Sequence, residues 1–313
     1  MKAPLINQDP KRRRFLKAML SVPVVASAGV FNGAVMAKDR RPAETNKMNS
    51  LKLSLNAYSF NAPLLNGSMT IEDMIEFCAE QGLVAVDITG YYFPGYPNVP
   101  ADDYLYKVKR KAFNLGIEIC GTGVRNDFTH ADPAKRRESV QLVKNWIDVA
   151  EKIGGQTIRI FSGNQKPEGH SRAQVLEWML NDIRECIDYG KRHGVVVALQ
   201  NHDDFIKTAA DTIEIMEAIK SEWYGLMLDI GSFRTTDPYD EIAQTIKYAV
   251  TWQIKEKVFV SGKEVDVDAD KLVSLIKKSS FRGYLPLETI GQGDPKTKVA
   301  ALVNKFRNAL SKT

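Results

Sequence analysis

From about Leu51 onward, short apolar runs alternate with longer stretches in which apolar residues recur every three to four positions. Short runs predict buried strands, and the longer period predicts amphipathic helices. Glycines stand between several of these helices and the next strand, where helix ends favour them. The predicted strands are 53–60, 85–89, 117–121, 157–161, 195–199, 224–228, 250–254 and 284–288; the predicted helices are 71–81, 103–115, 134–153, 173–193, 209–220, 239–248, 269–278 and 296–310.

This alternation of strands and helices predicts an α/β fold with a parallel sheet, because helical crossovers connect parallel strands. Eight units in about 260 residues match the size of a closed (β/α)8 TIM barrel. An open, doubly wound sheet is the alternative. The first strand is not followed by the Gly-x-Gly-x-x-Gly turn of dinucleotide-binding sheets, so we expect the barrel and no nucleotide cofactor.

Four of the predicted strands in the second half of the chain end on or near a polar side chain. These side chains are Gln200, Asp229, Gln253 and Glu288. Active sites of (β/α)8 barrels lie at the carboxyl ends of the strands, where all eight following loops surround one mouth. The sequence therefore predicts a site built from two carboxylates and two amides.

The first residues are typical of an export signal. A basic stretch, residues 11–17, precedes the uncharged residues 18–37, which end in the small residues of a cleavage site. The segment resembles a twin-arginine signal with Arg12 and Arg13 as the pair. We therefore predict a signal peptide over 1–37, a polar linker over 38–50, one barrel domain over 51–313, and a periplasmic location.

The uncharged stretch 18–37 contains serines, glycines and a proline, so it is less apolar than a stable span of roughly 20 residues should be. An uncleaved membrane anchor remains the alternative. After cleavage we expect no membrane span in the mature protein.

The basic charge of the chain resides in this predicted signal. The chain has 43 basic and 38 acidic residues, and residues 1–37 hold six of the basic and one of the acidic ones, so 37 of each remain. A mature protein of zero net charge is not expected to bind nucleic acid, and a small-molecule ligand fits better. Cys78, Cys120 and Cys186 are widely spaced within apolar patterns, which predicts buried free thiols.

Over roughly residues 51–310 the chain resembles the sugar phosphate isomerase/epimerase group of xylose isomerase-like TIM barrels. The resemblance rests on the order and strand positions of several short stretches: LVAVD at 83–87, ALQNH at 198–202, LDIG at 228–231, WQIKE at 252–256 and GYLPLE at 283–288. It implies a small sugar as the substrate.

The resemblance also implies a divalent metal held by Glu, Asp, His and Glu at the ends of strands five to eight. Here Gln200 stands at the first position, Asp229 matches the second, Gln253 replaces the His, and Glu288 matches the last. An amide oxygen is a weaker metal ligand than a carboxylate or an imidazole. A metal held by this set would be bound weakly, and Mg²⁺, Mn²⁺ or Ca²⁺ would suit it better than Zn²⁺.

Family epimerases use the glutamates of strands five and eight to remove and return a proton beside a carbonyl, and an amide at Gln200 cannot act as such a base. Glu288 is the remaining base. His202 and Lys255 are the candidates for a second proton-transfer group. A one-base isomerisation, or an elimination or hydration at a keto-sugar, therefore fits better than two-base epimerisation.

Several other residues are candidates for binding the substrate. Arg159 lies within the fourth strand, Tyr91 and Tyr92 follow the second, His130 follows the third, and Glu256 follows the seventh. Each has a structural alternative, such as loop packing for the tyrosines or an exposed ion pair for Glu256 with its neighbour Lys255. Residues 266–270 lack the glycine of a calcium-binding loop and are interpreted as a helix N-cap region.

Together these features favour an exported sugar isomerase/epimerase-like enzyme that transfers a proton next to a carbonyl of a small sugar or keto-sugar. One alternative is a keto-sugar lyase or hydratase on the same barrel. Another is a non-catalytic carbohydrate-binding barrel that has lost the metal chemistry through Gln200 and Gln253. The related apurinic endonucleases need a histidine-rich cluster of three zinc ions, and this chain has four histidines in all.

Overall fold

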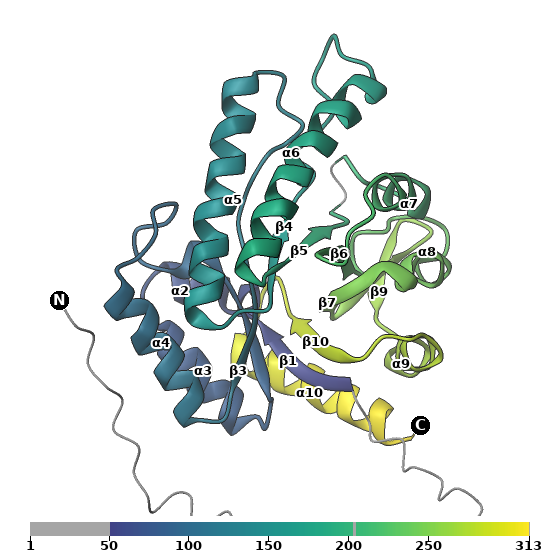
Figure 1. Ribbon diagram of the computed structural model, residues 1–313. Coiled ribbons are helices and arrows are strands. Elements are labelled where there is room, and N and C mark those ends of the chain that lie inside the picture. Colours follow the sequence, from purple (N-terminus) through teal and green to yellow (C-terminus); the bar gives the residue numbers. More distant parts are fainter. Residues whose placement is uncertain (1–50, 203–204, 313) are drawn as a thin grey trace, which may run out of the picture. The chain divides into compact units, whose positions relative to one another are not determined.

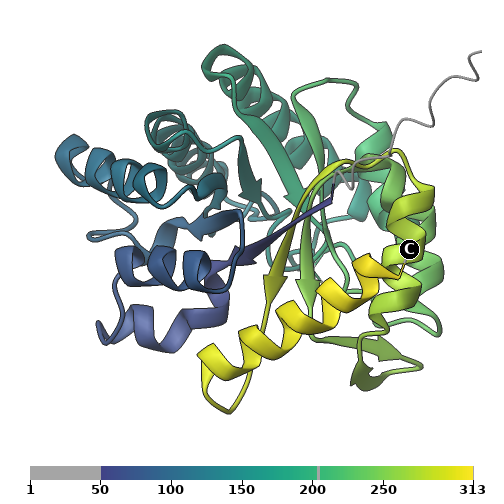
Figure 2. The ribbon, with the colours of Figure 1, turned by 90° about the horizontal axis from the view of Figure 1, so that it is seen from below.

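Eight parallel strands close into a barrel in the computed structural model, which describes residues 51–202 and 205–312 (Figures 1 and 2). The predicted (β/α)8 TIM barrel is therefore confirmed. The predicted signal peptide and linker lie outside the described residues. In chain order the barrel strands are β1 (Leu51–Asn56), β2 (Ala85–Thr89), β3 (Glu118–Gly123), β4 (Thr157–Ile160), β5 (Val196–Gln200), β6 (Tyr224–Asp229), β7 (Ala249–Lys255) and β10 (Gly283–Glu288).

A helix follows each barrel strand and covers the outside of the barrel (Figure 2). None of the helices in the described part of the chain combines the length and apolar character needed to cross a bilayer. The major helices are α3 (Ile71–Glu80), α4 (Asp102–Asn114), α5 (Pro133–Ile153), α6 (Arg172–His193), α7 (Ala209–Glu217), α8 (Pro238–Thr245), α9 (Ala269–Lys278) and α10 (Pro295–Ser311); α2 (Asn61–Leu65) and the 3-10 turns η1 (Ala57–Phe60), η2 (Gly90–Tyr92) and η3 (Ile246–Tyr248) are short.

The structure differs from the predicted elements at two strands that reach the mouth. Strand β1 stops at Asn56 instead of continuing to residue 60, because the Asn56 side chain accepts a hydrogen bond from the Tyr58 amide at 2.9 Å and starts the turn η1. Strand β7 continues past Gln253 to Lys255. Gln253 is therefore not the end of its strand, and Lys255 lies two positions later on the same face.

An antiparallel hairpin of β8 (Lys257–Val260) and β9 (Lys263–Asp266) follows β7 and was not predicted. Its second strand is exposed and largely charged, so it carries no alternating apolar pattern. The predicted N-cap region after it is confirmed, since Asp268 accepts a hydrogen bond from the Lys271 amide at 2.9 Å at the start of α9. The three cysteines are buried and free, as predicted.

The pleat of the strands divides the barrel into an apolar outer face and a polar inner face at the mouth. On β7, for example, Trp252 and Ile254 are fully buried, whereas Gln253 and Lys255 line a cavity. The alternation places apolar side chains against the helices and polar ones inside. Apolar core therefore lies between the sheet and the helices.

Gly123 on β3 leaves space for a large side chain of the neighbouring strand. A Cβ atom on Gly123 would lie 2.9 Å from Nε and 3.1 Å from Cζ of Arg159. Strand β3 pairs Gly123 with Arg159 in the parallel ladder. The guanidinium of Arg159 can remain inside the barrel because β3 has no side chain at this point.

We expect Gly123→Ala to lower the free energy of unfolding by about 1–3 kcal/mol, because the buried Arg159 would have to move. Gly155→Ala is the matched control, since its Cβ would meet its nearest atom at an ordinary 3.5 Å. Urea unfolding of both variants measures the difference. Equal losses in the two variants would contradict this account of β3.

Candidate active site

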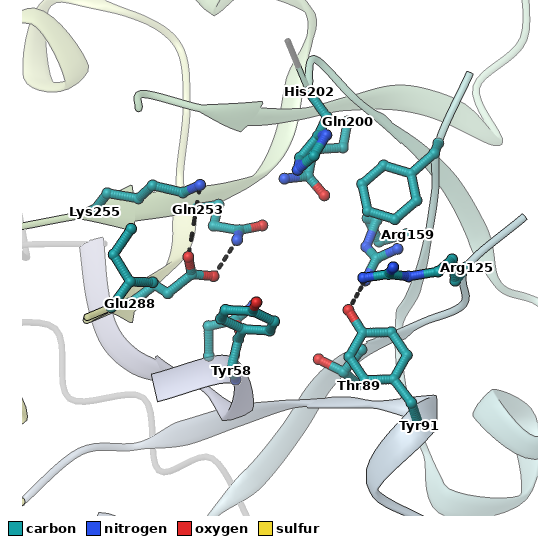
Figure 3. A pocket seen from close by; sticks show the side chains of 13 residues that line it. Tyr58, Thr89, Tyr91, Arg125, Arg159, Gln200, His202, Gln253, Lys255 and Glu288 are labelled. Atoms are coloured by element: carbon teal, nitrogen blue, oxygen red, sulfur yellow. Dashed lines mark hydrogen bonds and ion pairs between the residues drawn. The ribbon is translucent and has the colours of Figure 1, made fainter. Parts of the chain in front are cut away.

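A cavity of about 160 Å³ opens at the carboxyl ends of the barrel strands (Figure 3). Its position is the one at which enzymes with this fold place their catalytic groups. The lining residues come from seven barrel strands or the segments that follow them: Asn56, Tyr58, Thr89, Tyr91, Arg125, Arg159, Phe161, Gln200, His202, Gln253, Lys255, Glu288 and Ile290.

Many of the residues singled out from the sequence meet at this cavity. Seven line it directly, and an eighth, Asp229, is fully buried and hydrogen-bonded to one of them. The seven are Tyr91, Arg159, Gln200, His202, Gln253, Lys255 and Glu288.

Three predicted substrate-binding residues have other surroundings. The Tyr92 hydroxyl donates to Asn61 at 2.9 Å. His130 Nδ1 accepts from the Asp132 amide at 3.0 Å, beside a separate groove. Glu256 is paired with Lys298 at 2.8 Å. Its structural alternative, an exposed ion pair with Lys255, is not what the structure shows, because Lys255 lies against Asp229 and Glu288. None of the three lines the cavity.

Asp229 accepts hydrogen bonds on both of its carboxylate oxygens. Oδ1 accepts from the Gly231 amide at 2.9 Å. Oδ2 accepts from Gln200 Nε2 at 2.8 Å and from the Ser232 hydroxyl at 2.9 Å, and it lies 3.0 Å from the Lys255 ammonium. The carboxylate is fully buried, and each of its partners is a donor suited to its negative charge.

Glu288 is the second buried carboxylate and faces the cavity directly. It accepts a hydrogen bond from Gln253 Nε2, and its Oε1 lies 3.6 Å from Lys255 Nζ (Figure 3). Burial raises the pKa of Glu288 to about 7, although the Lys255 ammonium works in the opposite direction. A carboxyl with such a pKa exchanges a proton readily near neutral pH.

Lys255 lies between the two carboxylates and is 14% exposed. Burial by itself lowers the pKa of Lys255, but Asp229 and Glu288 outweigh burial and raise the pKa above its ordinary value. The side chain is therefore an ammonium ion near neutral pH.

The opposite wall of the cavity is cationic and aromatic. Arg159 donates from Nη2 to the Tyr91 hydroxyl at 2.7 Å, and its guanidinium lies 4.0 Å from the centre of the Phe161 ring. Arg125 lies beside Tyr91 on the same wall, and Tyr58 borders the cavity below (Figure 3). Positive groups and ring faces are suited to polar ligands that carry hydroxyl or carbonyl oxygens.

Asp87 is a buried carboxyl near the site that sequence reasoning did not assign to it. Burial raises the pKa of Asp87 to about 7, the charge of Arg159 opposes this rise, and the charge of Glu288 adds to it. A single acidic residue within the apolar run 85–89 was the available signal. Asn56, Tyr58, Thr89 and Ile290 were also missed, since their types are common in loops and strand ends.

The residues expected to hold a divalent metal do not present a set of metal-binding atoms. The NH₂ groups of Gln200 and Gln253 face the two carboxylates, and the Lys255 ammonium lies against both acids. Nowhere in the described ranges do three or more His, Cys, Asp or Glu side chains gather as a metal site would require. The donor chemistry of this site therefore does not fit a metal.

Comparisons with known proteins agree with the fold. The model of a protein family described as a xylose isomerase-like TIM barrel matches residues 75–309. A search of curated protein sequences finds no match to the chain.

Solved structures of similar fold include enzymes that act on sugars. D-psicose 3-epimerase with D-tagatose from Clostridium cellulolyticum H10 is 15% identical, with a TM-score of 0.67 over 83% of this chain and 99% of that one. The 3-keto-D-glucoside 4-epimerase from E. coli is 14% identical, with a TM-score of 0.67 over 82% and 99%. The IOLI protein, whose structure has a bound zinc atom, is 16% identical, with a TM-score of 0.66 over 83% and 97%. At these identities the likeness establishes the fold.

Proposed function

The chain belongs to the xylose isomerase-like TIM barrel family, and we propose that it is a sugar isomerase/epimerase-like enzyme that transfers a proton next to a carbonyl of a small sugar or keto-sugar. The observation that carries this proposal is Glu288, a buried carboxyl with a pKa of about 7 that faces a polar cavity beside an ammonium. Similar barrels that are sugar epimerases support it.

The proton transfer follows from these groups. Glu288 in its carboxylate form takes a proton from the carbon beside the carbonyl, and the electrons of the broken C–H bond move to the carbonyl oxygen. The developing negative charge is stabilised by a hydrogen bond from the Lys255 ammonium, which points into the cavity (Figure 3). Return of a proton to the opposite face of the same carbon gives epimerisation. Return to the former carbonyl carbon gives isomerisation, when the hydroxyl on the first carbon loses its proton to become the new carbonyl and the former carbonyl oxygen gains one.

The identity of the base limits which outcome is favoured. Glu288 is the acidic side chain among the residues that line the cavity. His202 also lines it and is the second candidate for proton transfer; its ring centre lies 4.8 Å from that of Phe161. With one carboxylate base, return of the proton to the same face favours isomerisation between adjacent carbons. Expulsion of a leaving group from the same enolate would give the lyase or hydratase alternative.

The cavity also offers contacts for the hydroxyl groups of a sugar. The amide oxygens of Gln200 and Gln253 are turned toward the open space, while Tyr58 and Tyr91 border it (Figure 3). Amide oxygens accept hydrogen bonds from hydroxyls, and tyrosine rings pack against the C–H faces of sugars. Arg159 and Arg125 on the far wall donate to sugar oxygens.

The residues before the barrel support export of the protein. The arginine pair Arg12-Arg13 and the uncharged stretch 18–37 support export by the twin-arginine route, with the mature protein in the periplasm. In such a location, an unphosphorylated sugar is the expected substrate.

We expect the protein to exchange solvent deuterium into one or more members of a panel of keto-sugars, as measured by NMR. Glu288→Gln should lower this exchange by about 10²-fold or more, because an amide cannot take the proton. Glu256→Gln, which removes a carboxylate outside the cavity, is the matched control and should exchange normally. Binding of sugars without any exchange by the wild type would instead support the carbohydrate-binding barrel.

The exchange rate should rise with pH through about 7, because burial raises the pKa of Glu288 to about 7 and only the ionised form accepts a proton. Below this pH the protonated acid predominates and the rate should fall about tenfold per pH unit. A pH profile of exchange at saturating substrate tests this. A profile that is flat between pH 5 and 8 would exclude Glu288 as the base.

Replacing Arg12 and Arg13 together by lysine should block export, because the twin-arginine machinery recognises the pair and not merely its charge. Arg14→Lys is the control, since it keeps the pair intact. Cell fractionation and N-terminal sequencing of the mature protein measure the outcome. Unchanged export of the double variant would contradict the proposed route.

A further inference from the structure

Lys255 lies where four side chains from strands β5, β6, β7 and β10 converge. It shares the inner face of β7 with Gln253 and pairs with Glu288 across the ladder between β7 and β10. Its Nζ atom is 3.0 Å from Asp229 Oδ2 and 3.6 Å from Glu288 Oε1. A positive charge thus lies between the two carboxylates that the resemblance assigned to a metal ion.

We propose that the ammonium of Lys255 takes the place of the divalent cation, so that this site works with a built-in organic cation and does not bind a metal. The use of that cation in catalysis rests on the function proposed above. The exclusion of a metal rests on the geometry of the four side chains alone.

The hydrogen bonds of Asp229 support this proposal. Oδ2 already has three donors, Gln200 Nε2, the Ser232 hydroxyl and Lys255 Nζ, and Oδ1 has the Gly231 amide. A carboxylate has about four lone-pair directions. A metal ion could bind this group only by displacing partners that are themselves buried.

The orientation of the two amides also supports the proposal. A carboxylate only accepts hydrogen bonds, so each amide must turn its NH₂ group toward it. Gln200 does so toward Asp229 and Gln253 does so toward Glu288. Their oxygens are therefore turned away from these carboxylates, and Figure 3 shows them directed into the cavity.

The two glutamines and the lysine also fit one another in charge. A Glu in place of Gln200 would add a third buried negative charge beside Asp229, against the single ammonium of Lys255. Two carboxylates, one ammonium and two neutral amides leave a smaller imbalance for the interior to bear. The departure at 200 is therefore explained by the presence of Lys255.

The same arrangement leaves one N–H of Lys255 for a ligand. Its Nζ atom has two anionic neighbours, Asp229 at 3.0 Å and Glu288 at 3.6 Å, and three N–H groups, and the side chain lines the cavity. The third can donate to a carbonyl or hydroxyl oxygen of a substrate, the contact that a metal ion would otherwise supply.

Titration with Mn²⁺, followed by electron paramagnetic resonance without substrate, tests the proposal. We expect no saturable Mn²⁺ binding by the wild type and no effect of EDTA on its thermal unfolding. Lys255→Met should raise Mn²⁺ affinity by about tenfold or more, because the repelling ammonium is gone and the two carboxylates remain. Adding Gln200→Glu and Gln253→His to Lys255→Met should raise it further.

Lys257→Met is the matched control, since Lys257 is paired with Asp266 on the hairpin and lies outside the cavity; it should leave Mn²⁺ binding as in the wild type. Wild-type binding of one Mn²⁺ per chain that is lost in Asp229→Asn would overturn the proposal, whether or not Lys255→Met folds. Because no substrate is present, a failure of the proposed sugar chemistry would appear separately, as absent deuterium exchange in the presence of EDTA.

Discussion

The ion pairs of Lys255 with Asp229 and Glu288 are the interaction on which the rest of the site depends. Both acids are buried, and each would lose the favourable hydration of its charge without compensation. Removing one member of such a set leaves an uncompensated charge in the interior. The lysine therefore keeps two carboxylates ionisable inside a protein, and Gln200, Ser232 and Gln253 add hydrogen bonds to them.

The barrel provides the positions that this interaction needs. Asp229 and Glu288 end β6 and β10, and Lys255 ends β7 between them, so three neighbouring parallel strands present their charges at one edge. The opposite wall balances them with Arg159, for which Gly123 on β3 leaves space. Opposed walls of different charge are a property of the closed sheet, because strands far apart in an open sheet would not face one another.

Much of the fold and part of the site could be predicted from the sequence. The apolar runs located β6 and β10, and hence Asp229 and Glu288, because a buried strand that stops on a carboxylate is a strong local pattern. Lys255 was predicted as a candidate for proton transfer but not as the partner of both acids, because its position after a strand does not reveal which way its long flexible side chain points. Asp87 was missed because one acid within an apolar run does not reveal what surrounds it.

The link between Lys255 and the two glutamines is a relation that only the structure makes visible. From the sequence alone, Gln200 and Gln253 are interpreted as two independent replacements of metal ligands. In space, each amide donates to one of the two acids that Lys255 bridges. The amides and the ammonium have the same role, because each provides N–H groups to buried carboxylates in the place of a metal ion. The two glutamines therefore do not indicate a damaged site, since they complete the hydrogen bonding of a different one.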